Sequence, residues 1–229
     1  MRNLLIYSLV TTGIITFYGC ENQQKKEAAQ APQTAQIKTV RPEYQFSAVA
    51  QYIRNDGSKY ITQQHFQIAS SPRAIMISAA EPFGNVVWSV ENGIYSAPQN
   101  TGRAIDKDVF ALMTDKDIAI GIMELYLAAA GKVQAADTNE ILNFDGKIYE
   151  QVATEGEAKV YRNKSTKTID LVTSGGQKNG GTYLFSGYNY EKILENGIEK
   201  GLYPSKVDIY LYKSAYDKRL LGQLTVKSE

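Results

Sequence analysis

Few residues of this 229-residue chain could support catalysis or metal binding. It has one histidine, His65, and one cysteine, Cys20, which excludes a multi-histidine metal cage, a multi-cysteine metal site and an internal disulfide. A catalytic triad would need His65, yet the pattern KYITQQHFQI places it with Gln63 and Gln67 on the polar side of a predicted strand. No G-x-S-x-G elbow or phosphate-binding glycine loop occurs. We therefore predict no enzymatic activity and no cofactor; a hydrolase with a carboxylate pair, which leaves no local signature, is the remaining catalytic alternative.

Four aspartates lie close together at Asp106, Asp108, Asp115 and Asp117. They could bind calcium, but their spacing is not that of an EF-hand loop. Acidic residues are also favoured at the positive ends of helices, and Asp106 and Thr114 occupy positions typical of N-caps. Asp117 follows Thr114 by three residues, as in a capping box. We interpret this cluster as two helix starts and predict no metal site.

The first twenty residues, MRNLLIYSLVTTGIITFYGC, have the pattern of an export signal. Arg2 precedes an apolar stretch that is shorter than the roughly 20 residues of a usual membrane-spanning helix. Residues 17–20, Phe-Tyr-Gly-Cys, resemble the bacterial lipobox, in which a small residue precedes the cysteine that receives diacylglycerol. The resemblance implies a signal peptide over residues 1–19 and a lipoprotein anchored through acyl chains on Cys20 to a membrane of the bacterial cell envelope, inner or outer. An uncleaved signal anchor, or a plain export signal with an incidental cysteine, are the alternatives.

Residues 20–43 are rich in Gln, Ala and Lys and almost free of large apolar side chains, which predicts a flexible tether. Residues 44–229 are then predicted to form one domain. The whole chain has 25 Lys+Arg and 24 Asp+Glu, and this balance argues against a nucleic-acid partner, which usually requires a basic excess.

The domain is predicted to be mainly β with a short helical insertion. Apolar and polar residues alternate in about ten short segments, and Asn-Gly at 92–93 and Asp-Gly at 145–146 predict hairpin turns. The later strands are predicted at residues 158–162, 168–173, 182–188, 205–212 and 220–227, with Gly201 in a connecting loop. Residues 118–130 are apolar nearly all round, have Glu124 as their only charge and end at Gly131, which predicts a buried helix. We expect a curved antiparallel sheet, or half-barrel, with helices over its concave face; a helix on one flat face of a sandwich fits the periodicity equally well.

The order of these elements resembles the periplasmic carriers and outer-membrane receptors of the Lol lipoprotein-sorting pathway. The resemblance rests on Trp88-Ser-Val-Glu-Asn-Gly-Ile-Tyr-Ser-Ala-Pro98 and on Tyr203-Pro-Ser-Lys-Val-Asp-Ile-Tyr210. It covers roughly residues 44–227 and implies a half-barrel that shelters acyl chains, with a role in lipoprotein or lipid trafficking.

The leading hypothesis is therefore an envelope lipoprotein that binds an acyl chain or another apolar ligand. Its predicted lining consists of apolar side chains on shared strand faces, namely Phe66, Ile68, Ile75, Ile77, Trp88, Val207, Ile209 and Leu211. A closed core would need the same residues. The alternative is thus a non-catalytic structural or sensory envelope lipoprotein with a filled interior and a protein partner.

Overall fold

The computed structural model describes residues 42–81, 84–97, 106–133, 140–178, 180–195 and 198–227, all within the compact unit formed by residues 40–229. The strands are β1 (Tyr44–Ile53), β2 (Lys59–Ser70), β3 (Arg73–Glu81), β4 (Gly84–Glu91), β5 (Ile94–Ser96), β6 (Ile141–Phe144), β7 (Lys147–Glu155), β8 (Ala158–Asn163), β9 (Ile169–Lys178), β10 (Gly181–Glu195), β11 (Ile198–Tyr212) and β12 (Lys218–Val226). The helices are α2 (Lys107–Met113) and α3 (Lys116–Ala129). The predicted signal peptide, Cys20 and most of the predicted tether lie outside the described residues.

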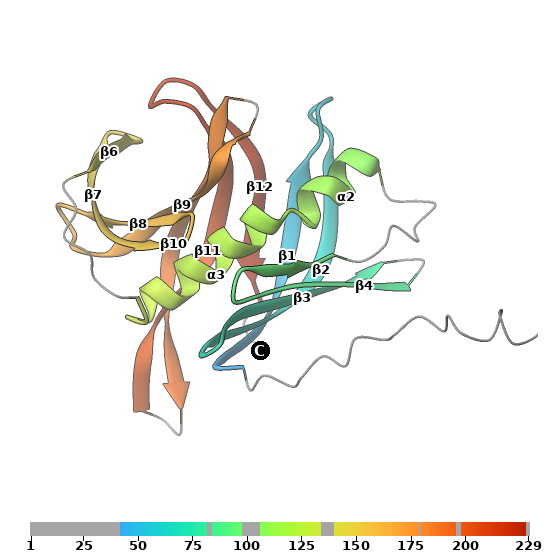
Figure 1. The fold of residues 1–229 in the computed structure, drawn as a ribbon, viewed down its shortest axis with the longest axis horizontal. Helices are drawn as coiled ribbons and strands as arrows, with labels where there is room; N and C mark the ends of the chain where they lie inside the picture. Colours follow the sequence, from blue (N-terminus) through green and yellow to red (C-terminus); the bar gives the residue numbers. More distant parts are fainter. Residues whose placement is uncertain are drawn as a thin grey trace, which may run out of the picture. The chain divides into compact units, whose positions relative to one another are not determined.

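All of these strands form one antiparallel sheet in the order β5-β4-β3-β2-β1-β12-β11-β10-β9-β8-β7-β6 (Figure 1). Strands that follow one another along the chain are paired, except where the helices separate β5 from β6. At the centre, β1 pairs with β12 and joins the two halves of the sheet. The predicted mainly β fold with a helical insertion is confirmed, and the helices connect the two outer edges of the sheet.

The sheet bends around α3. A helix of 14 residues is about 21 Å long, and α3 contacts β3 and also β8. Those two strands are seven strand spacings apart in the sheet, or about 34 Å at about 4.8 Å per spacing. A flat sheet could not bring both strands to one helix of that length. The predicted half-barrel with a helix over its concave face is therefore confirmed, and the flat sandwich is not.

The two ends of α3 follow from local hydrogen bonding. The Lys132 amide donates to the Leu127 carbonyl at 2.7 Å and the Gly131 amide donates to Ala128 at 2.9 Å, which is the Schellman arrangement that needs the positive φ of Gly131. The helix thus stops at the predicted glycine. At its start, Asp115 is the N-cap and accepts from the Asp117 amide at 2.8 Å.

The predicted N-cap role of Thr114 is wrong, whereas that of Asp106 is confirmed. Thr114 is the last residue of the preceding helical turn, and its hydroxyl donates back to the Phe110 carbonyl at 2.8 Å. It therefore closes α2 and cannot cap α3. Asp106 accepts from the amides of Asp108 and Val109 at the start of α2.

Both predicted hairpin turns are confirmed, because Asn92-Gly93 and Asp145-Gly146 have positive φ at both residues. The later strands are longer than expected, since β10 and β11 have 15 residues each, and the described sheet has twelve strands where about ten were predicted. Gly201, predicted in a loop, pairs with Ile193 inside this long hairpin. In this part of the hairpin β10 and β11 pair with each other. The sequence of this part shows no clear alternation of apolar and polar residues, and for that reason the extension of the two strands was not predicted.

The C-terminal half of the sheet is buried on both faces. Val172 and Phe185 belong to the main core beneath α3, whereas their neighbours Leu171 and Leu184 point to the opposite face. A second apolar cluster forms on that face, composed of Phe144, Tyr149, Tyr161, Leu171 and Leu184. The β6–β7 turn reaches back towards β12 on this side, where Lys218 forms an ion pair with Asp145. No helix among the described residues combines the length and apolarity needed to cross a bilayer.

Candidate functional site

Most of the predicted lining residues lie in the main core. Seven of them are at most 1% exposed and belong to the cluster that includes α3, namely Phe66, Ile68, Ile75, Ile77, Trp88, Val207 and Ile209. The eighth, Leu211, is half-buried and borders a pocket described below. A ligand would therefore touch the seven core residues only if it displaced part of α3. Their role as a ligand lining stays a prediction.

Close packing fixes α3 against the sheet. Gly121 faces the ring of Phe185 so closely that a Cβ at position 121 would lie 2.0 Å from Phe185 Cε2. The ring of Tyr126 stacks on Phe46 with centroids 4.5 Å apart, and its hydroxyl donates to the Pro204 carbonyl at 3.0 Å. Helix α3 is therefore held on both halves of the sheet.

One buried ion pair joins α3 to strand β3 and lies close to the end of β7. Arg73 Nε on β3 donates to Glu124 Oε1 at 3.0 Å, and a second guanidinium nitrogen contacts Glu124 Oε2. Arg73 Nη1 also lies 3.6 Å from Glu155 Oε1 at the end of β7. The side chain of Glu124 is only 2% exposed, and burial raises the pKa of its carboxyl although Arg73 opposes this shift. Because strands β3 and β7 lie far apart in sheet order, Arg73 bridges two strands that only the curvature of the sheet brings together.

A pocket of about 420 Å³ lies beside this ion pair and is called the seam pocket here. Its apolar wall comes from Val90 and from Ile120 and Met123 of α3. The β4–β5 and β7–β8 turns form its sides, and Arg73, Lys116, Glu124, Glu155 and Glu157 make the remainder strongly charged.

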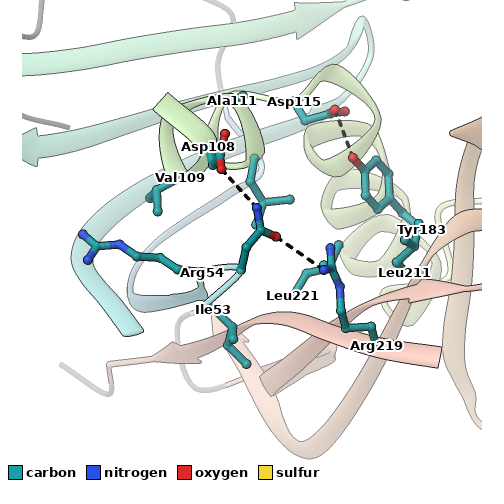
Figure 2. Close-up of a pocket in the computed structure, with 12 residues that line it drawn as sticks. Ile53, Arg54, Asp108, Val109, Ala111, Asp115, Tyr183, Leu211, Arg219 and Leu221 are labelled. Atoms are coloured by element: carbon teal, nitrogen blue, oxygen red, sulfur yellow. Dashed lines mark hydrogen bonds between the residues drawn. The ribbon is translucent and has the colours of Figure 1, made fainter. Parts of the chain in front are cut away.

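A second pocket, of about 230 Å³, lies beneath α2 and is called the mouth pocket (Figure 2). Its walls come from β1, α2, β11 and β12, with apolar side chains from Ile53, Val109, Ala111, Leu112, Leu211 and Leu221. The mouth pocket includes Leu211, which is one of the predicted lining residues.

Polar side chains form the rim of the mouth pocket (Figure 2). The Asn55 amide donates to Asp108 Oδ2 at 3.0 Å and accepts from Arg219 Nη1 at 3.4 Å. Tyr183 donates to Asp115 Oδ2 at 3.2 Å. Apolar walls with a polar rim suit a ligand that has an apolar part and a polar end.

Neither pocket contains His65. Its Nδ1 lies 2.8 Å from Ser47 Oγ on the exposed side of β1 and β2, as its polar strand neighbours predicted. In the described part of the chain, no group of three or more His, Cys, Asp or Glu residues is arranged to hold a metal ion. Asp106 and Asp115, from the aspartate cluster, are engaged as helix caps.

Comparison with known proteins gives only distant likenesses. No family model matches the chain, and no curated protein matches its sequence. Among solved structures, it is similar to a LolA superfamily protein from Nitrosomonas europaea, at 10% identity and a TM-score of 0.42, over 80% of this chain and 83% of that one. It is also similar to a domain assigned to an outer membrane lipoprotein-sorting protein from Vibrio parahaemolyticus, at 10% identity and a TM-score of 0.39, over 91% of this chain and 89% of that one. Both names belong to the group that the sequence resembles, but at these TM-scores the likeness carries no inference about ligand or partner.

Proposed function

We propose that this chain is a lipid-anchored protein of the bacterial envelope that binds an acyl chain or another apolar ligand between its helices and the concave face of its sheet. The observation that supports this most is the mouth pocket, because its apolar walls and polar rim lie beneath a short helix and include a predicted lining residue, Leu211. The anchor and the envelope location rest on the lipobox resemblance of residues 17–20. A role in lipoprotein or lipid trafficking would follow from such binding.

Helix α2 is the element that a ligand could move most easily. It has seven residues, of which only Val109 and Met113 are buried, whereas eleven residues of α3 are buried. An apolar chain entering the mouth pocket would replace contacts of α2 with its own, at about 25 cal/mol per Å² of apolar area removed from water. The ion pair of Arg73 with Glu124 would hold α3 in place meanwhile.

Binding of a fluorescent fatty acid tests this proposal. The full chain carrying Cys20→Ser would be titrated with cis-parinaric acid, so that no acyl anchor of its own competes. Leu211→Asn places a polar group in the wall of the mouth pocket, and we expect about tenfold weaker binding, equivalent to about 1.4 kcal/mol.

The matched control is Leu202→Asn, on the same strand but exposed and outside both pockets. It should bind the probe like the parent chain. An absence of probe binding by the parent chain, or equal affinities for the two variants, would count against a ligand in this pocket.

A structural or sensory lipoprotein with a filled interior is the second candidate. The burial of seven predicted lining residues against α3 favours it. It predicts that organic extraction of the purified full chain recovers no lipid. It also predicts that crosslinking in cells captures a defined protein partner, whose yield does not change with Leu211→Asn.

A further inference from the structure

The mouth pocket is lined by two arginines and two aspartates, but these side chains are not all in close ion pairs. Arg54 Nε lies 3.7 Å from Asp106 Oδ2. Asp108 and Asp115 stand at the starts of α2 and α3, where the positive helix end stabilises a carboxylate. Arg219 differs, because among the described residues no carboxylate lies within 4 Å of its guanidinium, and its hydrogen bond to the neutral Asn55 amide is long, at 3.4 Å.

Arg219 also stands directly beside the apolar wall. It is the cross-strand partner of Leu211, so its stem lies next to that side chain at the pocket surface. Asn55, which donates to Asp108 on its other side, accepts this one hydrogen bond from Nη1 of the exposed Arg219 side chain. The remaining donors of Arg219 are therefore close to apolar side chains and to solvent at the same time (Figure 2).

We propose that the mouth pocket binds an anionic amphiphile, with a carboxylate or phosphate head on Arg219 and its apolar chain between α2 and β11–β12. This deepens the proposed function and rests on it, since it names the head group of the ligand. Arginine suits such a head because its planar fork can bind two oxygens at once. The pocket volume of about 230 Å³ is roughly the share of eight water molecules, so the buried part of the chain is short.

Two probes with the same chain and different heads test the proposal. Octanoate and 1-octanol would be titrated calorimetrically at neutral pH into the full chain carrying Cys20→Ser. Charge-assisted hydrogen bonds predict that octanoate binds about ten- to a hundredfold more tightly than octanol. Arg219→Gln should lower the octanoate affinity to that of octanol. The control Arg162→Gln removes an equal charge from β8, away from this pocket, and should keep the preference.

The outcomes separate this inference from the proposed function. If octanoate and octanol bind equally, or if Arg219→Gln keeps the preference, the head-group assignment is overturned while chain binding stands. If neither probe binds, the proposed function falls together with the inference. Acetate and inorganic phosphate carry the head without the chain, and binding of either one as tightly as octanoate would show a simple anion site and overturn the amphiphile.

Discussion

Replacing Gly121 by alanine tests whether α3 occupies the concave face of the sheet. The added Cβ would lie 2.0 Å from Phe185 Cε2, 2.3 Å from Cζ and 2.5 Å from Cδ2, whereas carbon atoms in contact stay about 3.5–4.0 Å apart. Phe185 is fully buried on β10 and has little room to yield. Overpacking of this kind costs about 1–3 kcal/mol, of which the better helix propensity of alanine returns at most about 1 kcal/mol. We expect Gly121→Ala to lower the free energy of unfolding by about 0–2 kcal/mol, with no net gain.

Urea unfolding of a double-mutant cycle measures this cost. Phe185→Ala alone should destabilise by about 3–5 kcal/mol, and adding Gly121→Ala to it should then be neutral or stabilising. The control Gly176→Ala adds a Cβ that meets no atom within 4 Å and should change the stability by less than about 0.5 kcal/mol. A Gly121→Ala variant that is more stable than the parent chain would refute the placement of α3 on β10.

Three further predictions concern charges and the anchor. Arg73→Ala leaves Glu124 buried without its partner and should lower the free energy of unfolding in urea by about 3–5 kcal/mol. The control Arg162→Ala removes one member of a partly exposed pair and should lower it by at most about 1 kcal/mol. Equal losses for the two variants would contradict the burial argument. Because burial raises the pKa of Glu124, the folded chain binds a proton on this carboxyl more readily than the unfolded chain does. The parent should therefore gain stability relative to Glu124→Gln as pH falls from neutral towards 4.5. A difference in urea midpoints that does not change with pH would contradict this. Metabolic labelling with an alkynyl fatty acid should mark the parent chain and not Cys20→Ser, and labelling of both would remove Cys20 as the attachment site.

The parts of the fold that could be predicted from sequence are those encoded locally. Asn92-Gly93 and Asp145-Gly146 define their hairpins because few residues tolerate positive φ. Gly131 marks the end of α3 for the same reason. The apolar character of residues 118–130 indicated burial because a helix on a surface needs a polar face.

Contacts between distant parts of the chain could not be predicted in this way. Glu124 was recognisable as the only charge of an apolar helix, and a buried carboxylate needs a cation. Choosing Arg73 from 25 basic residues requires the curvature of the sheet, which depends on all strands together.

The mouth pocket could not be predicted from local sequence patterns either. Asn55, Asp108 and Arg219 come from the β1–β2 turn, α2 and β12. The pairing of the first strand with the last brings Asn55 close to Arg219, and the packing of α2 on β1 adds Asp108. No spacing in the sequence predicts that these three residues meet. Of the predicted lining residues, Leu211 lies here because it is near the end of β11, whereas residues nearer the strand centres lie under α3.

Photocrosslinking with a diazirine-bearing fatty acid tests the central claim most directly, because it maps where an apolar chain lies on the protein. After irradiation of the full chain carrying Cys20→Ser, peptide mass spectrometry should find the label on α2 and on the β11–β12 residues around Leu211 and Leu221, and octanoate in excess should prevent it. Label on the outer, polar side of β1–β4, or no label that octanoate can displace, would contradict a ligand-binding interior.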